Sequence, residues 1–348
     1  MALENKVFVI IIPFVDDGGV ERLVANMSNY LDDKGNDVFV YSISSGNSLG
    51  KVFFKKDFFI SFNKLLYLII KNRKQIILFS ALTPANLFAT FLCILFGLKF
   101  YPTHNCVIFK KNIIKWFFIK LIYNFINIFS YKFIATSSGT EDNLNTILIN
   151  SKKVVNYYNP VLEILYKPVS SKRLEAGVIK FCMLGRLSHQ KGFDIIIEAF
   201  AKINNRNIYN FELYIGGNGE ELIFLKNLAI KYNLTNKIHF VGFVSNLNEF
   251  YEGKDYFLFP SRYEGLGLAL IEAMNYGLPV ISSNCLSGPS EILFNGDIGI
   301  LIEHFENPDE WANEILKVLT SLPKNISINY ELSLKRFLIS EYLNKLVI

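Results

Sequence analysis

Residues 259–293 read FPSRYEGLGLALIEAMNYGLPVISSNCLSGPSEIL and indicate the architecture of the second half of the chain. Phe259 and Pro260 end an apolar run that is typical of a buried strand. The helix that follows stops at Gly277-Leu278-Pro279, because glycine takes a left-handed cap conformation and proline cannot continue the turn. The apolar residues after it predict a second buried strand. The pattern is a strand–loop–helix–strand unit of an α/β protein.

Two acids lie close to the start of this helix. Glu264 stands in the loop before it and Glu272 roughly two turns inside, with Gly265, Leu266 and Gly267 at the helix start. The first amides of a helix have no partner within it and carry about half a positive charge, so they suit a phosphate. The two glycines let a diphosphate approach the backbone, and the carboxylates can accept hydrogen bonds from sugar and ribose hydroxyls. The alternative is an ordinary helix whose two acids face solvent.

A second motif carries paired cations. Residues 185–192 read GRLSHQKG and follow an apolar strand pattern, so Arg186 and Lys191 stand in a loop where cations can meet a diphosphate. The alternative is surface charge.

Glu264 and Glu272, with seven residues between them, resemble the paired-glutamate motif of family-four glycosyltransferases of the GT-B class. The 185–192 segment resembles the G-R-x-x-x-x-K-G segment of the same family.

The resemblance extends over nearly the whole chain and is strongest over 178–293. Gly18 and Gly19 begin the sequence GGVE, which is similar to the GG-x-E loop that faces the donor diphosphate and the acceptor in this family. Gly217 lies where the family carries a G-x-G-x-x loop. His104 follows a strand, where open α/β sheets place ligands, and in the family a histidine here lies near the sugar-transfer site. A simple strand-to-helix turn and a structural histidine are the alternatives.

The composition is that of a globular protein with two domains. The chain has 348 residues, of which 51% are hydrophobic and 19% charged, so it has ample material for buried cores. Its four cysteines are far apart, and their spacing matches neither a metal-binding nor a redox motif. We interpret them as residues of the protein core in a protein of a reducing compartment. The N-terminal apolar run is preceded by an acid and lacks a cleavage pattern, so we expect a buried strand and no signal peptide there.

The net charge of +5 is unevenly distributed. Between Lys51 and Thr136 the only acid is Asp57, and this block is rich in apolar and aromatic residues, which favours an anionic membrane surface over nucleic acid as its partner. A long helix is predicted over 110–131; an interior helix with a few exposed lysines is the alternative. Residues 76–98 carry no charge, but Thr, Pro, Asn and Gly divide them, so a buried βα unit is preferred to a membrane span. The bases of the block are Lys51, Lys55, Lys56, Lys64, Lys71, Arg73, Lys74, Lys99, Lys110, Lys111, Lys115, Lys120 and Lys132.

The fold class predicted is α/β. The resemblance implies the GT-B architecture, in which two Rossmann-like domains face each other across a cleft that holds the donor. We expect an N-terminal acceptor- and membrane-facing domain over 1–165 and a nucleotide-sugar-binding domain over 173–328. A Pro- and Ser-containing linker from Val155 to Arg173 joins them. Residues 329–348 are expected to form a C-terminal helix that packs back on the first domain.

The resemblance implies a retaining glycosyltransferase that moves a hexose or N-acetylhexosamine from a UDP-sugar to a lipid-linked or lipopolysaccharide/O-antigen saccharide acceptor. No D-x-D sequence occurs, so we expect neither a metal nor another cofactor, with Arg186, Lys191 and helix amides stabilising the leaving diphosphate. Arg186, Lys191, Glu264 and His104 are the catalytic candidates. We expect a cytoplasmic, peripheral membrane protein. The competing hypothesis is a membrane-surface nucleotide-sugar-binding protein with an inactive transferase fold; a phosphorylase- or epimerase-type relative is a more remote alternative. The candidates for donor binding are Gly18, Gly19, Gly217, Gly265, Leu266, Gly267 and Glu272.

Overall fold

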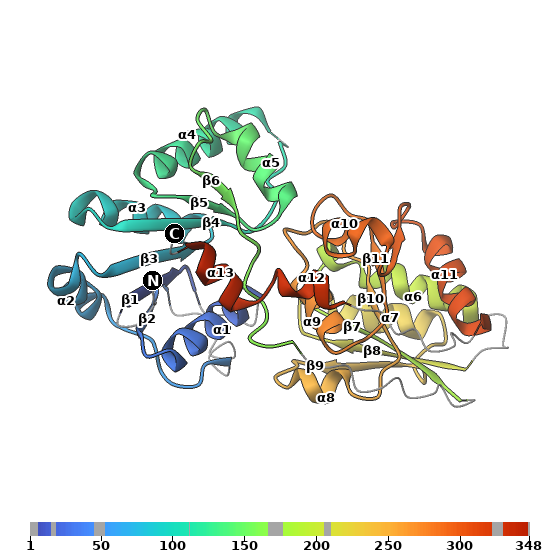
Figure 1. Cartoon of the computed structure of the whole chain (residues 1–348). Helices are drawn as coiled ribbons and strands as arrows, with labels where there is room; N and C mark the ends of the chain where they lie inside the picture. Colours follow the sequence, from blue (N-terminus) through green and yellow to red (C-terminus); the bar gives the residue numbers. More distant parts are fainter. Residues whose placement is uncertain are drawn as a thin grey trace. The chain divides into compact units, whose positions relative to one another are not determined.

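The computed structural model describes residues 6–14, 19–44, 53–110, 112–165, 177–204, 210–321 and 330–346. The chain divides into two compact units, as Figure 1 shows. The first comprises Met1–Glu163 and Arg336–Ile348, and the second comprises Ile164–Lys335. Within the described residues each unit contains one six-stranded sheet whose strands all pair in parallel. Helices connect successive strands, which confirms the predicted α/β class with two Rossmann-like domains.

The sheet of the first unit has the strand order β2-β1-β3-β4-β5-β6. Its strand β1, which pairs with β2 and β3, is a continuous run of branched and aromatic residues that is buried along its whole length, because helices cover both faces of the sheet. The strands are β1 (Val7–Ile12), β2 (Asp37–Ser42), β3 (Ile76–Ala81), β4 (Lys99–His104), β5 (Phe133–Ala135) and β6 (Val154–Asn156).

The helices of the first unit form two layers. Buried side chains of α2, α3, α4 and α5 pack with Val7 and Val9 on one face of the sheet. On the other face, α1 and α13 pack with Phe8 and Ile10, so the C-terminal helix is part of this core. Figure 1 shows α1 and α13 on the side of the sheet away from α4. These helices are α1 (Gly19–Asp33), α2 (Phe62–Asn72), α3 (Thr83–Phe96), α4 (Ile113–Phe129), α5 (Ser138–Ile147) and α13 (Ile339–Leu346).

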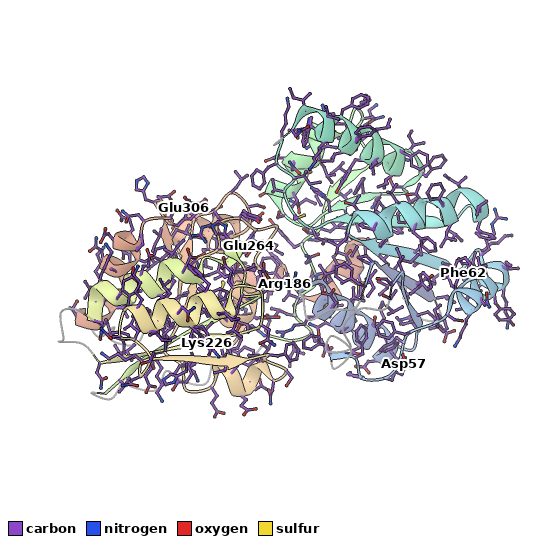
Figure 2. All side chains as sticks on the ribbon, turned by 180° about the vertical axis from the view of Figure 1, so that it is seen from behind. Asp57, Phe62, Arg186, Lys226, Glu264 and Glu306 are labelled. Atoms are coloured by element: carbon purple, nitrogen blue, oxygen red, sulfur yellow. The ribbon has the colours of Figure 1, made fainter. Side chains whose placement is uncertain are left out.

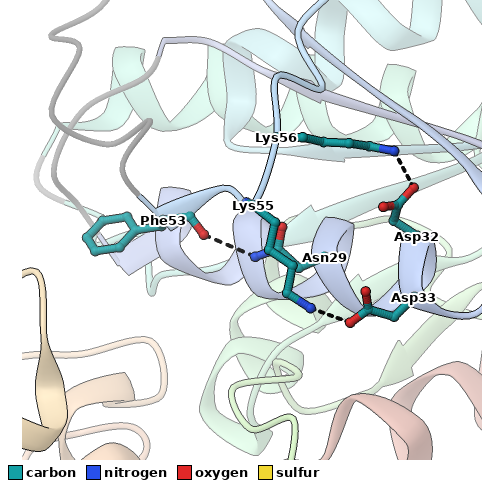
Figure 3. Close-up of polar contacts among 6 residues, drawn as sticks. All are labelled: Asn29, Asp32, Asp33, Phe53, Lys55 and Lys56. Carbon is teal, nitrogen blue, oxygen red and sulfur yellow. Dashed lines mark hydrogen bonds and ion pairs between the residues drawn. The ribbon is translucent and has the colours of Figure 1, made fainter.

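Two lysines of the basic block are bound to the acidic end of α1, as Figure 3 shows. Lys55 forms an ion pair with Asp33, and Lys56 Nζ lies 2.6 Å from Asp32 Oδ1. The backbone N–H of Lys55 also donates to Asn29 Oδ1 at 3.0 Å. The sequence interpretation counted both lysines as uncompensated, and for these two it is wrong, because their acidic partners come from an earlier helix.

The sheet of the second unit has the strand order β12-β11-β10-β7-β8-β9. On one face of it, α6, α7 and α11 bury a core that includes Phe200, Leu225 and Trp311. The strands are β7 (Ile179–Leu184), β8 (Phe211–Gly216), β9 (Ile238–Gly242), β10 (Tyr256–Phe259), β11 (Val280–Ser283) and β12 (Ile300–Ile302). The helices are η2 (His189–Lys191), α6 (Phe193–Asn204), α7 (Leu222–Lys231), α8 (Leu247–Tyr251), α9 (Leu268–Asn275), α10 (Pro289–Ile292), η3 (Phe294–Gly296), α11 (Pro308–Ser321) and α12 (Glu331–Lys335).

The structure decides two alternatives in the first unit. Residues 76–98 form strand β3 and helix α3, as preferred, and among the described residues no helix is long and apolar enough to cross a membrane. Val155 was assigned to the linker, but it pairs with Ile134 in the sixth strand of the sheet. The short strand β6 escaped the pattern because its three residues offer too little periodicity to detect.

Candidate functional site

The strongest candidate residues gather at one edge of the second sheet. The strand order reverses between β7 and β10, since β8 and β9 continue on one side of β7 while β11 and β12 continue beyond β10. In open α/β sheets, ligands bind outside the carboxyl ends of the strands at such a switch point. The loop after β7 carries Arg186 and Lys191, and the loop after β10 carries Glu264. The topology therefore brings together residues that lie more than seventy positions apart.

Lys191 and Glu264 form an ion pair across this switch point. Lys191 Nζ lies 2.5 Å from Glu264 Oε1, and the two side chains are 22% and 8% exposed. The pair is thus shielded enough to be stronger than a surface salt bridge, while the lysine still reaches solvent. Arg186 is exposed on the same loop as Lys191. Figure 2 shows Arg186 and Glu264 on the same side of the second unit.

Two glycines allow the loops at this edge to approach one another closely. Gly192 follows Lys191 with φ of +66°, and a Cβ atom there would lie 2.1 Å from the carbonyl oxygen of Pro260. Gly217 follows β8 with φ of +126°, and a Cβ atom there would lie 1.9 Å from the carbonyl oxygen of Gly185. Both values are far below normal contact distances, so only glycine fits at either position. Gly217 therefore supports the Arg186 loop through its backbone.

Helix α9 begins immediately after the Glu264 loop. Gly267 is its N-cap residue in a left-handed conformation, and its carbonyl oxygen accepts from the N–H groups of Leu270 and Ile271. Leu266 and Glu272 are buried. The amides at the start of α9 thus face the same edge of the sheet as Lys191, where they can add to its positive potential. Gly265 belongs to this loop, and its carbonyl oxygen accepts a hydrogen bond from Ser287 Oγ at 2.8 Å.

In the first unit, His104 lies at the carboxyl end of β4 and is buried. Its Nε2 lies 3.0 Å from Asn143 Oδ1, and its Nδ1 lies 3.2 Å from the Tyr123 hydroxyl. Because Asn143 also accepts from the N–H of Ile108 and donates to its carbonyl oxygen, its Oδ1 faces the histidine, and Nε2 must carry a proton. Burial lowers the pKa of His104 to about 4, so the ring is neutral near pH 7.

The first unit has its own switch point, between β1 and β3, and helix α1 begins after β1 there. Gly19 is the first residue of α1, whereas Gly18 lies outside the described residues. The roles expected for these glycines and for His104 in transfer stay predictions.

Comparisons with known proteins agree with this geometry. Residues 170–331 match the family model described as glycosyl transferases group 1. An uncharacterized glycosyltransferase of Haemophilus influenzae is 27% identical over 93% of this chain and 92% of its own length. The crystal structure of Anabaena HepE in complex with UDP and glucose covers 99% of this chain and 98% of that chain, with a TM-score of 0.80 at 17% identity. The chain is a glycosyltransferase with the GT-B fold.

A further relative of this glycosyltransferase has a more specific name. The Escherichia coli protein named UDP-Gal:alpha-D-GlcNAc-diphosphoundecaprenol alpha-1,3-galactosyltransferase is 26% identical over 86% of this chain and 79% of its own length. Other relatives, from Methanocaldococcus jannaschii and Erwinia amylovora, are 34% identical, but the match covers 36% and 34% of their own lengths.

The sequence reasoning missed the side chain that connects the two loops holding Lys191 and Glu264. Arg262 precedes Glu264 and forms a two-point ion pair with Asp194 of α6, at 2.9 Å and 2.6 Å. Its Nη1 also donates to the carbonyl oxygen of His189, two residues before Lys191, at 2.7 Å. The pKa of Arg262 is raised above its usual value mainly by the hydrogen bond to Asp194. The arginine two positions before a motif glutamate was the available signal.

A second missed feature is the backbone of Leu82, which follows β3 at the switch point of the first unit. Leu82 has φ of +72° and ψ of 152°, a region that costs a non-glycine residue on the order of 1–3 kcal/mol. Such strain concentrates at ligand sites. No sequence pattern signals it, because leucine is an unremarkable residue before a helix.

Proposed function

We propose that this glycosyltransferase transfers a hexose or N-acetylhexosamine from a UDP-sugar to a lipid-linked or lipopolysaccharide/O-antigen saccharide, with retention at the anomeric carbon. The observation that carries the proposal is the Lys191–Glu264 pair at the switch point of the second sheet, with Arg186 exposed beside it. The donor and acceptor classes are supported by relatives: one solved neighbour binds UDP and glucose, and one relative is named for a UDP-galactose donor and a diphosphoundecaprenol-linked acceptor.

The second unit supplies the donor site in this proposal. Arg186, Lys191 and the first amides of α9 hold the diphosphate, whose negative charge grows as the bond to the sugar C1 breaks. Glu264 accepts hydrogen bonds from the sugar hydroxyls, and Glu272 from the ribose. Lys191 and Glu264 neutralise each other in the structure described here. A donor replaces this contact with two charge-assisted ones, lysine to phosphate and carboxylate to sugar.

The transfer step follows from the retained configuration. The C1–oxygen bond to the diphosphate breaks, C1 acquires oxocarbenium character, and the acceptor hydroxyl forms the new bond on the same face. The acceptor proton then goes to an oxygen of the departing diphosphate, because that oxygen lies on the same face. Glu264 is not a nucleophile in this scheme. The cationic side chains carry out the charge stabilisation without a metal ion.

The first unit is proposed to face the acceptor, with the protein peripheral on the inner face of the cell membrane. Its switch point, which holds Gly19 and the strained Leu82, is the place where the acceptor saccharide would enter.

A thermal-shift panel of nucleotide sugars, followed by kinetics on charge variants, tests this function. We expect UDP-sugars to raise the melting temperature, since a ligand of the native state stabilises it. Arg186→Ala and Lys191→Ala should each lower kcat on the order of a hundredfold while changing donor KM less. Lys226→Ala is the matched control, because Lys226 is an exposed lysine of α7 that Figure 2 shows away from Arg186. Donor binding without any turnover would favour the inactive binding protein instead.

A further inference from the structure

The outer surface of α4 is apolar along most of its length. In a helix that packs on a sheet, the side chains facing away from the sheet are normally polar. On α4 the side chains of Ile113, Phe117 and Leu121 are 77%, 63% and 59% exposed, while only Tyr123, Ile126 and Asn127 are buried. The alternative left open by the sequence, an interior helix, therefore does not apply. The other exposed apolar side chains of α4 are Ile114, Phe118, Ile128 and Phe129.

The lysines of α4 border this apolar stripe on both sides. At about 100° per residue, Ile113, Phe117 and Leu121 project within roughly 80° of one another. The other exposed apolar residues of α4 widen the stripe to about 160°, and the exposed Lys115 and Lys120 project just beyond its two edges. An apolar face between two basic edges is the arrangement of helices that lie in a membrane interface, where lysines extend to the lipid headgroups.

The neighbouring helix α3 extends the stripe into a surface. The rings of Phe91 on α3 and Phe125 on α4 lie 6.0 Å apart, so the two helices meet along their outer sides. Ile94 and Leu95, near the end of α3, are also exposed. Figure 1 shows α3 and α4 on the same side of the first sheet, which both helices cover through one shared core. We call the exposed apolar residues of α3 and α4 the α3–α4 surface.

The segment that carries the α3–α4 surface contains bases but no acids. No aspartate or glutamate occurs between Phe58 and Thr140, a segment that includes both helices and all the loops joining them. Arg73 reaches the end of α3, where a Cβ atom on Gly97 would lie 2.9 Å from its guanidinium. Lys55 and Lys56, by contrast, are paired with acids of α1, which packs on the other face of the sheet.

We propose that the α3–α4 surface docks onto an anionic lipid bilayer, with Ile113, Phe117 and Leu121 inserted at the level of the acyl chains and Lys115 and Lys120 at the headgroups. A second copy of the chain is a poorer occupant, because in a symmetric interface both partners would present the same segment, which has lysines but no acid to pair with them. A lipid surface satisfies both the apolar side chains and the positive charge. This inference rests on the surface alone and holds whether or not the proposed donor and acceptor are correct.

Flotation of the full chain with vesicles tests the proposal. We expect it to bind vesicles of phosphatidylcholine with phosphatidylglycerol, and to bind vesicles of phosphatidylcholine alone at least about tenfold more weakly at low salt. Raising the salt concentration should weaken the binding to anionic vesicles, because exposed charges are screened. Equal, weak binding to both lipid types would overturn the proposal.

Variants of α4 separate the contribution of apolar insertion to vesicle binding from that of the lysine charges. Phe117→Ser with Leu121→Ser should lower the apparent affinity for anionic vesicles at least about tenfold, because apolar burial drives insertion. Lys115→Glu with Lys120→Glu should lower it by a similar factor at low salt and have less effect at high salt. The affected side chains are exposed, so circular dichroism and the melting temperature should stay unchanged. Wild-type affinity in either double variant would refute the proposal.

Two matched controls accompany these variants. Ile223→Ser with Ile230→Ser removes two similarly exposed apolar side chains from α7 of the second unit. Lys55→Gln with Lys56→Gln removes two lysines whose charges are already paired. Both should bind anionic vesicles as the wild type does. A loss of binding in either control equal to that of the α4 variants would show a nonspecific effect and contradict the assignment to this surface.

Tryptophan fluorescence reports how deeply α4 inserts into the bilayer. The chain has two tryptophans, of which Trp311 is fully buried in the second unit and Trp116 is partly buried on α4. A tryptophan introduced by Phe117→Trp in a Trp116→Phe background stands on the exposed stripe, and anionic vesicles with brominated acyl chains should quench its emission. Absence of quenching in the bound protein would place the stripe away from the acyl chains. Sedimentation without lipid distinguishes the other occupant: a stable dimer that Phe117→Ser with Leu121→Ser dissociates would show that a second copy covers the surface.

Discussion

Gly192→Ala tests how the two loops of the proposed donor site depend on each other. The new Cβ atom would lie 2.1 Å from the carbonyl oxygen of Pro260, whereas real Cβ contacts do not fall below 3.0 Å, so the loops must separate by about 0.9 Å. Neither partner can rotate away, since both are backbone atoms. One loop carries Lys191 and the other Glu264, and a misplacement of about 1 Å at a reacting centre can cost on the order of a hundredfold in rate.

Gly253→Ala is the control for the cost in stability of placing alanine in a left-handed backbone conformation. Gly253 has φ of +70°, close to the +66° of Gly192, but a Cβ atom there meets nothing within 4 Å. Both variants should lose about 1 kcal/mol of stability, because alanine resists the left-handed conformation. Gly192→Ala should lose roughly 1–3 kcal/mol more through overpacking. We expect kcat/KM to fall on the order of a hundredfold in Gly192→Ala and less than about twofold in Gly253→Ala. Equal activity of the two variants would refute the coupling between the loops.

Three further predictions concern other parts of the molecule. Arg262 and Asp194 are only 13% and 21% exposed, so a double-mutant cycle of Arg262→Met with Asp194→Asn, measured by urea unfolding, should give a coupling of about 2 kcal/mol; additive effects would count against a shared role. Glu272→Ala should raise the donor KM about tenfold and leave kcat nearly unchanged in steady-state kinetics, since ribose contacts act equally in ground and transition states; a drop in kcat alone would contradict this. The pKa of His104 is lowered from 6.5 to about 4 in the folded state, so the unfolded state binds more protons between these values: stability is complete above pH 6.5 and is lost as the pH falls toward 4. Urea unfolding should show a loss of roughly 2 kcal/mol from pH 7 to pH 5 that His104→Gln lacks, and an unchanged slope in that variant would exclude His104 as the source.

Much of the fold was predictable because its signals are local. The buried parallel strands are continuous apolar runs, as in Val7–Ile12, and their helices end at glycine or proline, as α9 does before Pro279. The short strands β6 and β12 were not predicted, because they have only three residues each and draw their stability from the neighbouring strand.

The exposure of α4 could not be read from its composition. A helix rich in phenylalanine and isoleucine suits a protein interior as well as a lipid surface, and only the packing of Tyr123 and Ile126 against the sheet shows which side faces outward. The compensation of Lys55 and Lys56 is likewise a tertiary result, because their acids stand on α1.

The candidate chemistry was local information: cations in a loop after one strand, and glutamates around the start of a helix after another, can be recognised one segment at a time. The contact between these cations and glutamates could not be recognised in this way, because it depends on the strand order of the sheet. Placing β10 beside β7 puts Lys191 and Glu264 in contact across more than seventy residues. The Arg262–Asp194 pair and the contact of Gly192 with Pro260 follow from the same placement. Pairing between distant strands is a property of the whole sheet, since it is selected by the burial of both its faces, and no single segment encodes it.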